Sequence, residues 1–193
     1  MKRSSLVLTL LGLACFVGSP VVTAREAAAE PVYDSHSGSY YDLKVAPQLC
    51  GTGRCAIQWR GARKEATKHV YKGIQGRLAI IHSKHVHELL ARHFKLNKPF
   101  LSPAWIGLRY WCLNRKLEWV NGSVLKKVRG NFMAWDRPWF RNENVRCGRG
   151  AGVYMPVAYL PSYRWQASGR NKGHFYYFVE YPAKTEAAGG SSG

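Results

Sequence analysis

Three short apolar runs most constrain how this chain can fold. They lie at residues 76–81, 105–108 and 178–182, and they read Gly-Arg-Leu-Ala-Ile-Ile, Trp-Ile-Gly-Leu and Phe-Val-Glu-Tyr-Pro. Each joins apolar, partly β-branched residues to turn-forming residues, which is typical of buried strands. The sequence therefore predicts a core that brings together strands from distant parts of the chain.

Two segments have the periodicity of amphipathic helices. Residues 59–72 have apolar side chains at helical spacing, and Gly73 follows as a stop signal. Residues 84–94 show a second apolar face behind Ser83, a favourable N-cap residue. The expected inward residues are Trp59, Ala62, Ala66 and Val70 in the first helix, and Val86, Leu89, Leu90 and His93 in the second.

Most of the remaining ordered chain has the pattern of strands. Residues 117–120 alternate and lead into Asn121-Gly122, a strong hairpin signal. Further strands are predicted at 153–160, 163–167 and 175–181, and residues 39–48 could add an edge strand. Because two helices accompany this β structure, the predicted fold class is α+β.

Together these runs resemble the C-type lectin-like domain. That family has a Gly-Arg-Leu-Ala-type run after a first helix, a central Trp-Ile-Gly-Leu strand and a closing Phe-x-x-Glu-Tyr strand, and the likeness extends over about residues 59–182. The resemblance implies two helices packed on a mixed antiparallel sheet, with ligand bound in a long irregular loop region. That region corresponds to about residues 126–152 here. One departure is Val179, which stands where a cysteine of the usual long disulfide is common.

The resemblance also bears on calcium. Sugar-binding members hold calcium with a Glu-Pro-Asn-like and a Trp-Asn-Asp-like tripeptide, and the matching residues here are 137–139 (Arg-Pro-Trp) and 165–167 (Trp-Gln-Ala). Arg137 places a cation where the family has an anion, and Ala167 has no side-chain oxygen. Calcium needs about six to eight oxygen ligands. We therefore expect no calcium, no other metal and no cofactor.

The charge of the chain favours an anionic partner. There are 29 Lys and Arg against 11 Asp and Glu, a formal net charge of +18. Between residues 126 and 172 arginines are interleaved with aromatic residues; arginine binds sulfate, phosphate or carboxylate through paired hydrogen bonds, and aromatic rings stack on sugars. The expected ligand is an anionic glycan or a lipopolysaccharide. The candidate ligand-binding residues are Arg137, Trp139, Arg141, Asn142, Glu143, Asn144, Arg164 and Gln166.

Other functions remain open or are disfavoured. The same loop could dock on a protein partner as an adhesion module, or could bind nucleic acid and other polyanions nonspecifically by charge. We expect no enzyme, because the sequence has no nucleophile elbow and few acids for general acid–base chemistry. His82, His85 and His87 are close in sequence but are expected on different faces, which argues against a metal site.

The N-terminus predicts export. Residues 1–24 read as a cleavable signal peptide with a Lys2-Arg3 start, although a lipoprotein anchor at Cys15 is an alternative. We expect a secreted or periplasmic protein without a transmembrane segment. Its expected parts are a flexible leader at 25–48, the lectin-like domain at 49–182 and a disordered tail at 183–193.

Four cysteines remain after the signal peptide: Cys50, Cys55, Cys112 and Cys147. An even number in an exported protein suggests disulfides, and four cysteines allow three pairings. Cys50 and Cys55 bracket a short turn, so their pairing would leave Cys112 with Cys147. A zinc site is the alternative, but the spacing does not resemble that of a zinc finger.

Overall fold

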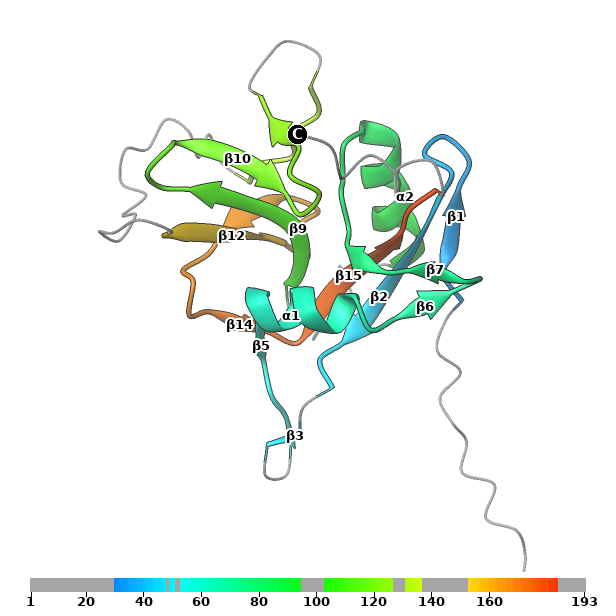
Figure 1. The fold of residues 1–193 in the computed structure, drawn as a ribbon, viewed down its shortest axis with the longest axis horizontal. Helices are drawn as coiled ribbons and strands as arrows, with labels where there is room; N and C mark the ends of the chain where they lie inside the picture. The colour runs from blue at the N-terminus through cyan, green and yellow to red at the C-terminus, as the bar shows by residue number, and fades with distance from the viewer. Residues whose placement is uncertain are drawn as a thin grey trace, which may run out of the picture.

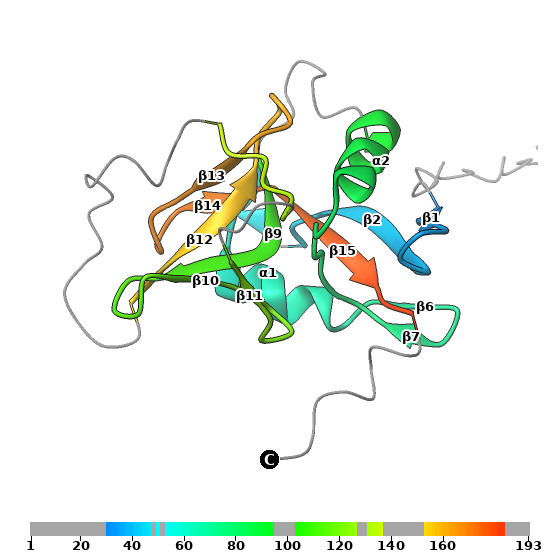
Figure 2. The same ribbon diagram turned by 90° about the horizontal axis from the view of Figure 1, so that it is seen from above.

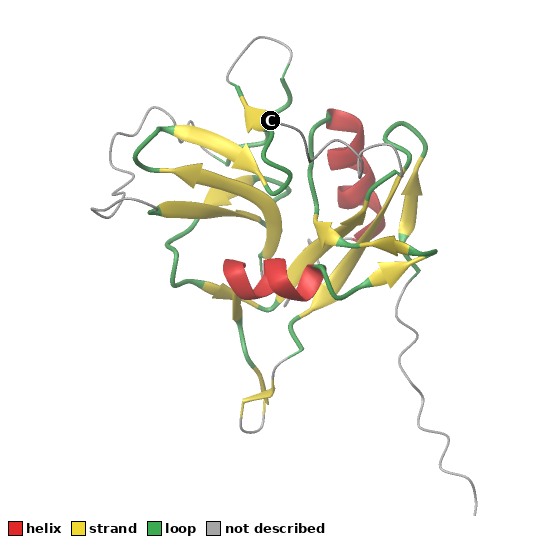
Figure 3. Ribbon diagram, in the orientation of Figure 1, coloured by secondary structure: helices red, strands yellow, loops and turns green. Residues whose placement is uncertain are grey.

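A mixed β-sheet with two helices forms the body of the molecule (Figures 1 and 3). The computed structural model describes residues 30–47, 49–50, 53–94, 103–126, 131–136 and 153–183. The main sheet has the strand order β1-β2-β15-β9-β10-β11, with β12 also on β9, β13 on β12 and β8 on β15. These strands are β1 (Val32–Asp34), β2 (Ser39–Val45), β8 (Arg77–Leu78), β9 (Ala104–Trp111), β10 (Lys116–Trp119), β11 (Val124–Leu125), β12 (Tyr154–Tyr159), β13 (Trp165–Ala167) and β15 (Tyr176–Tyr181). The α+β class and the packing of two helices on a mixed sheet are confirmed.

Three two-stranded pairs accompany the main sheet in the described residues. They are β3 (Leu49–Cys50) with β4 (Gly53–Arg54), β5 (Ile57–Gln58) with β14 (Gly173–His174), and β6 (Val70–Tyr71) with β7 (Ile74–Gln75). The β5–β14 pair joins the residues just before the first helix to those just before the last strand. This contact ties the two ends of the domain together at a second place.

The last strand, β15, lies at the centre of the sheet. It pairs antiparallel with β2 over the whole of its length and parallel with β9 at its start. Strands from the two ends of the domain therefore lie side by side (Figure 2). The strand expected within residues 39–48 forms as β2, whereas the expectation of a flexible leader is wrong for residues 32–45, because β1 and β2 are part of the main sheet. The physical reason is that β2 supplies the backbone partners for one edge of β15.

Alternation along β15 divides the core between the two helices. Phe178 packs in a cluster with Val86 and Leu90 of α2 (Lys84–Phe94). Its neighbours Tyr177 and Val179 pack on the other face with α1 (Trp59–Ala66). Successive strand side chains point to opposite faces, so β15 buries both sides and the helices lie on opposite faces of it (Figure 2). Fully burying each such side chain contributes about 1.5–3 kcal/mol.

The first helix is shorter than its pattern predicts. It ends at Ala66, and Lys72 and Gly73 have φ angles of +49° and +74° in the turn of the β6–β7 hairpin. Gly73 is therefore a hairpin residue rather than the residue that ends the helix. Val70 was expected on the apolar helix face, but it lies on β6 with 65% of its surface exposed.

The second helix matches its prediction in both bounds. The backbone N–H of Val86 donates to Oγ of Ser83 at 3.2 Å, so Ser83 caps the helix start. Val86 and Leu90 are buried and Leu89 is half-buried, whereas His93 is exposed at the last turn, contrary to expectation. A histidine near a helix C-terminus also interacts favourably with the last carbonyl groups.

The run at residues 76–81 is buried as predicted, but β8 pairs as a strand over Arg77 and Leu78 alone. Beyond it, the N–H of Ala79 donates to the Phe178 carbonyl at 3.0 Å, and the N–H of Gly107 donates to the Ala79 carbonyl at 2.8 Å. A Cβ on Gly107 would lie 2.7 Å from the Leu78 carbonyl oxygen. The glycine of Trp-Ile-Gly-Leu thus allows β9 to approach this segment closely.

Candidate functional site

Most of the predicted ligand-binding residues lie outside the described residues. Arg137, Trp139, Arg141, Asn142, Glu143 and Asn144 fall in the range 137–150, so their role stays a prediction. Arg164 and Gln166 are described, and they lie at β13, on the far edge of the sheet from β1. The candidate site is therefore built from β13 and from the segment 131–136 beside it.

Arg164 and Gln166 are both exposed, and Trp165 between them is fully buried. This alternation places the guanidinium-bearing and amide-bearing residues on one face of the strand and the indole on the other. Gln166 pairs with Ala158 of β12, which fixes its backbone position in the sheet. The two polar side chains are thus presented to solvent from an ordered strand.

Trp165 anchors the segment that leads toward residue 137. Its ring packs edge-on against Trp119, Phe132 and Trp135, with centroids 5.8, 5.7 and 5.7 Å away. Its backbone N–H donates to the Ala134 carbonyl at 2.6 Å, and its carbonyl accepts from the N–H of Asp136 at 3.0 Å. The segment 131–136 is therefore held against β13, close to Arg164 and Gln166. Of the tryptophans expected in the core, Trp105 and Trp119 are buried and Trp135 is half-buried.

The charge of Arg164 also acts on His87, a histidine of α2. His87 is half-buried and shares a 2.8 Å hydrogen bond between its Nδ1 and the Tyr159 hydroxyl. Burial lowers the pKa of His87, and the charge of Arg164 lowers it further. His87 is therefore favoured in its neutral form, and the Tyr159 hydroxyl donates to its backbone carbonyl at 3.3 Å as well as contacting Nδ1.

Basic residues outnumber acidic residues in this chain by 29 to 11. Most of the described acidic residues form ion pairs, and each pair neutralises one cation, so the remaining cations have no acidic residue to balance them. The carboxylates paired with a lysine or an arginine are those of Asp42, Glu65, Glu88, Glu118 and Glu180. A dissolved anion would therefore meet a surface on which the basic residues predominate.

Two pockets in the described part of the chain were not predicted from the sequence. One, of about 320 Å³, is lined by polar groups of the β10–β11 hairpin, including Asn121 and Ser123, together with Arg77 and His82. Asn121 Oδ1 accepts hydrogen bonds from the N–H and the hydroxyl of Ser123 at 3.1 and 2.7 Å. The second, of about 390 Å³, is more apolar and lies between Ile74 and Pro182. The Asn-Gly signal located the hairpin, but nothing in the sequence indicated that Arg77 faces it.

The metal-ligating groups are arranged differently from the sequence pattern. Among the described residues, Asp34, His36 and His85 form the group whose ligand atoms all lie within 4.8 Å of one another. His82 and His87 do not belong to it: His82 lines the hairpin pocket and His87 contacts Tyr159. The expectation that His82, His85 and His87 do not converge thus agrees with this arrangement, but His85 has other partners that the sequence did not suggest.

Cys55 and Cys112 are disulfide-bonded cysteines. The side chains of Cys50 and Cys147 lie outside what the structure describes, so the pairings Cys50–Cys55 and Cys112–Cys147 stay predictions. The signal peptide at 1–24 and the tail beyond 183 lie outside it as well. In the described ranges, neither helix has the length and apolarity that crossing a bilayer requires.

Solved structures place the architecture in a known class. Human lithostathine aligns at 16% identity over 79% of this chain and 95% of its own, with a TM-score of 0.54. The carbohydrate-recognition domain of the mouse scavenger receptor C-type lectin aligns at 14% identity over 76% and 92%, with a TM-score of 0.51. C-type lectin CEL-I from Cucumaria echinata aligns at 13% identity over 74% and 89%, also at 0.51. No protein-family model matches the sequence, and no curated protein does.

These alignments show that the chain has the C-type lectin-like fold. The identities are low, so the likeness concerns the fold. What the chain binds has to be argued from its own residues.

Proposed function

We propose that this chain is an exported binding protein that recognises an anionic carbohydrate without calcium. The ligand class is a cell-surface or envelope glycan, lipopolysaccharide included. The binding surface consists of Gln166 on β13, Arg164 immediately before this strand and the predicted loop residues 137–144. Export by the signal peptide at residues 1–24 is part of the same proposal.

The exposed pair at β13 is the observation that carries the proposal. Arg164 and Gln166 lie on one face of an ordered strand, next to a segment that Trp165 holds in place. A guanidinium group binds sulfate, phosphate or carboxylate with paired hydrogen bonds, and an amide can both donate to and accept from sugar hydroxyls. This combination suits a sugar that carries an anionic group.

Calcium independence rests on the same strand. In the resembled lectins this position supplies oxygen ligands, and here the third residue of the tripeptide is Ala167. Among the described residues, the cluster of possible metal ligands contains two histidines, and it lies at β1 and α2 rather than at β13. Calcium prefers an all-oxygen shell. The relatives with carbohydrate-recognition domains therefore support sugar binding here without supporting their calcium chemistry.

Surface plasmon resonance on immobilised polysaccharides tests this proposal. The untagged chain should bind a sulfated or uronic-acid polysaccharide and not a neutral one of the same length. Arg164→Gln and Gln166→Ala should each weaken that binding; for Arg164 a loss of about tenfold corresponds to a charge-assisted hydrogen bond of at least about 1.4 kcal/mol. Lys64→Gln is the matched control, because it removes one exposed cation from α1, on a different element.

The outcomes distinguish the alternatives. If Lys64→Gln weakens binding as much as Arg164→Gln, and salt abolishes binding to every anionic polymer alike, the binding is nonspecific. If no polysaccharide binds at physiological salt, a protein partner for the same surface becomes the better account. Either result would contradict the glycan proposal.

A further inference from the structure

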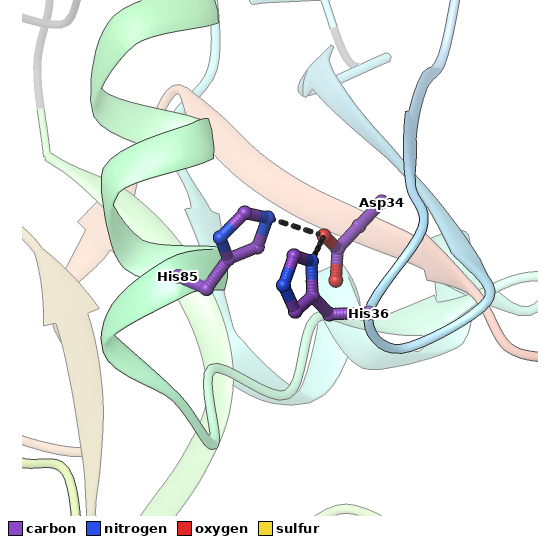
Figure 4. A group of neighbouring side chains, drawn as sticks. All are labelled: Asp34, His36 and His85. Atoms are coloured by element: carbon purple, nitrogen blue, oxygen red, sulfur yellow. Dashed lines mark ion pairs between the residues drawn. The ribbon is translucent and has the colours of Figure 1, made fainter.

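A buried carboxylate and two imidazoles converge where the first hairpin meets the second helix. Asp34 ends β1, His36 lies in the turn between β1 and β2, and His85 is the second residue of α2. Figure 4 shows both rings directed toward the carboxylate of Asp34. This cluster takes no part in the glycan site proposed above, since none of its residues belongs to β13 or to the segment 131–136.

The carboxylate of Asp34 is buried and held in a fixed orientation. The side chain of Asp34 is 0% exposed. Oδ2 accepts a 3.0 Å hydrogen bond from the backbone N–H of Ser37, which fixes the carboxylate plane. Oδ1 is buried as well and accepts no hydrogen bond; its neighbours are two imidazoles, with which it forms ion pairs.

Oδ1 faces both histidines. His85 Nε2 lies 2.9 Å from Oδ1, and His36 Nδ1 lies 3.9 Å from the same atom. The two rings are 3.7 Å apart between centroids and tilted by 35°. A buried carboxylate oxygen and two ring nitrogens thus converge on one place.

We propose that Asp34, His36 and His85 form a binding site for a divalent transition metal, with Zn²⁺ as the natural occupant. Imidazole nitrogen and carboxylate oxygen suit zinc, which they bind at about 2.0–2.2 Å in a tetrahedral arrangement. Ligand atoms in such a tetrahedron lie about 3.3 Å apart. The observed separations, at most 4.8 Å, approach this value, and the exposed His36 can move to close the difference.

The site would join two separate parts of the fold. The hairpin β1–β2 and the helix α2 lie next to one another (Figure 1), and a shared metal would link them. A ligand that binds the folded state alone stabilises it by mass action. The fourth coordination position would face solvent, because His36 on the outer side is 68% exposed.

Zinc titration of the untagged chain, stripped with a chelator and then dialysed, tests the site. We expect saturable binding of about one Zn²⁺ per chain by calorimetry and a rise in Tm on adding Zn²⁺. Added Ca²⁺ should produce neither effect, since two of the ligands are nitrogens. His36→Ala should weaken Zn²⁺ binding by about tenfold or more, as loss of a ligand should cost at least as much as loss of the groups around it.

His82→Ala is the matched control, because His82 is another exposed histidine near the start of α2. It should leave Zn²⁺ binding unchanged. Co²⁺ gives a second readout: the visible spectrum of four-coordinate cobalt with N and O ligands should appear in the unmodified chain and disappear in His36→Ala. If the unmodified chain shows no saturable Zn²⁺ binding, or His36→Ala binds as tightly as it does, the site does not exist. Because His36 is exposed, its replacement should not prevent folding.

Discussion

Loss of the buried carboxylate of Glu180 should lower the free energy of unfolding strongly. Glu180 lies on β15 with 2% of its side chain exposed. Oε2 accepts hydrogen bonds from the Ile80 N–H at 2.9 Å and from Arg77 Nε at 3.2 Å. Oε1 accepts from Arg77 Nη2 at 3.1 Å and from the Ser39 hydroxyl at 3.3 Å. One carboxylate thus joins β15 to β8, to β2 and to the segment after β8.

Glu180→Gln removes the charge with little change in shape, and it breaks the ion pair between Glu180 and Arg77. Removing one partner of a buried pair costs about 3–5 kcal/mol. Arg77 is 19% exposed, so water relieves part of this penalty and we expect the lower end, about 3 kcal/mol. For a domain of this size, that corresponds to a fall in Tm of roughly 6–12 °C. Urea denaturation followed by circular dichroism measures the same loss as a lower midpoint at an unchanged slope.

Two comparison variants separate this account from a general effect of the substitution. Glu65→Gln makes the same change in an ion pair with Lys68, whose side chain is 59% exposed, and should cost less than about 1 kcal/mol. Arg77→Met combined with Glu180→Gln removes both charges of the pair and should recover part of the loss. If Glu180→Gln costs no more than Glu65→Gln, the reasoning about the buried carboxylate is refuted.

Three further predictions concern stability. Gly107→Ala should lower the free energy of unfolding by about 1–3 kcal/mol, because the new Cβ would lie 2.7 Å from the Leu78 carbonyl oxygen and 2.9 Å from Val120. Gly169→Ala is the control: no atom lies within 4 Å of the new Cβ, so the urea midpoint should change little. Burial lowers the pKa of His174 from 6.5 to about 4, and the charge of Lys172 adds to this shift. Between these two pH values the unfolded chain binds a proton that the folded chain does not, so the folded state should lose stability as pH falls from about 6.5 to about 4. His174→Gln should therefore flatten the dependence of Tm on pH in that window. Burial alone would raise the pKa of Glu118, but hydrogen bonds from Lys116 and Arg109 outweigh it and lower the pKa from 4.5 to about 2. The stabilisation by the ionised carboxylate is therefore present above pH 4.5 and is lost as pH falls toward 2. A Glu118→Gln variant whose Tm changes with pH as that of the unmodified chain does would contradict this role of Glu118.

The sequence was sufficient to predict elements that are stabilised by contacts between residues close together in the chain. Ser83 followed by an apolar face predicted α2, and its hydroxyl does accept the hydrogen bond from Val86. Asn121-Gly122 predicted the turn after β10, and Gly122 has a φ angle of +86°. The Trp-Ile-Gly-Leu and Phe-Val-Glu-Tyr runs predicted two of the central strands. In each case neighbouring residues along the chain carry the information.

Long-range partners decided the elements that the sequence misjudged. Val70 fits a helical face in sequence, but it pairs with Gln75 in a hairpin that Lys72 and Gly73 turn. Residues 39–45 could be predicted as a strand, but not as an inner one, because their partner β15 lies more than a hundred residues later in the chain. Asp34 and His85 are also distant in sequence, so nothing in the local pattern around His85 indicated the carboxylate beside it.

The measurement that tests the central claim most directly is a glycan array probed with the untagged chain in EDTA and in excess calcium, each at low and at physiological salt. The account predicts selective binding to a subset of anionic glycans, with the same selectivity in EDTA and in calcium and with part of the signal kept at physiological salt. Binding that appears only in calcium would contradict calcium independence. A signal on every anionic glycan that disappears with salt would contradict specific recognition.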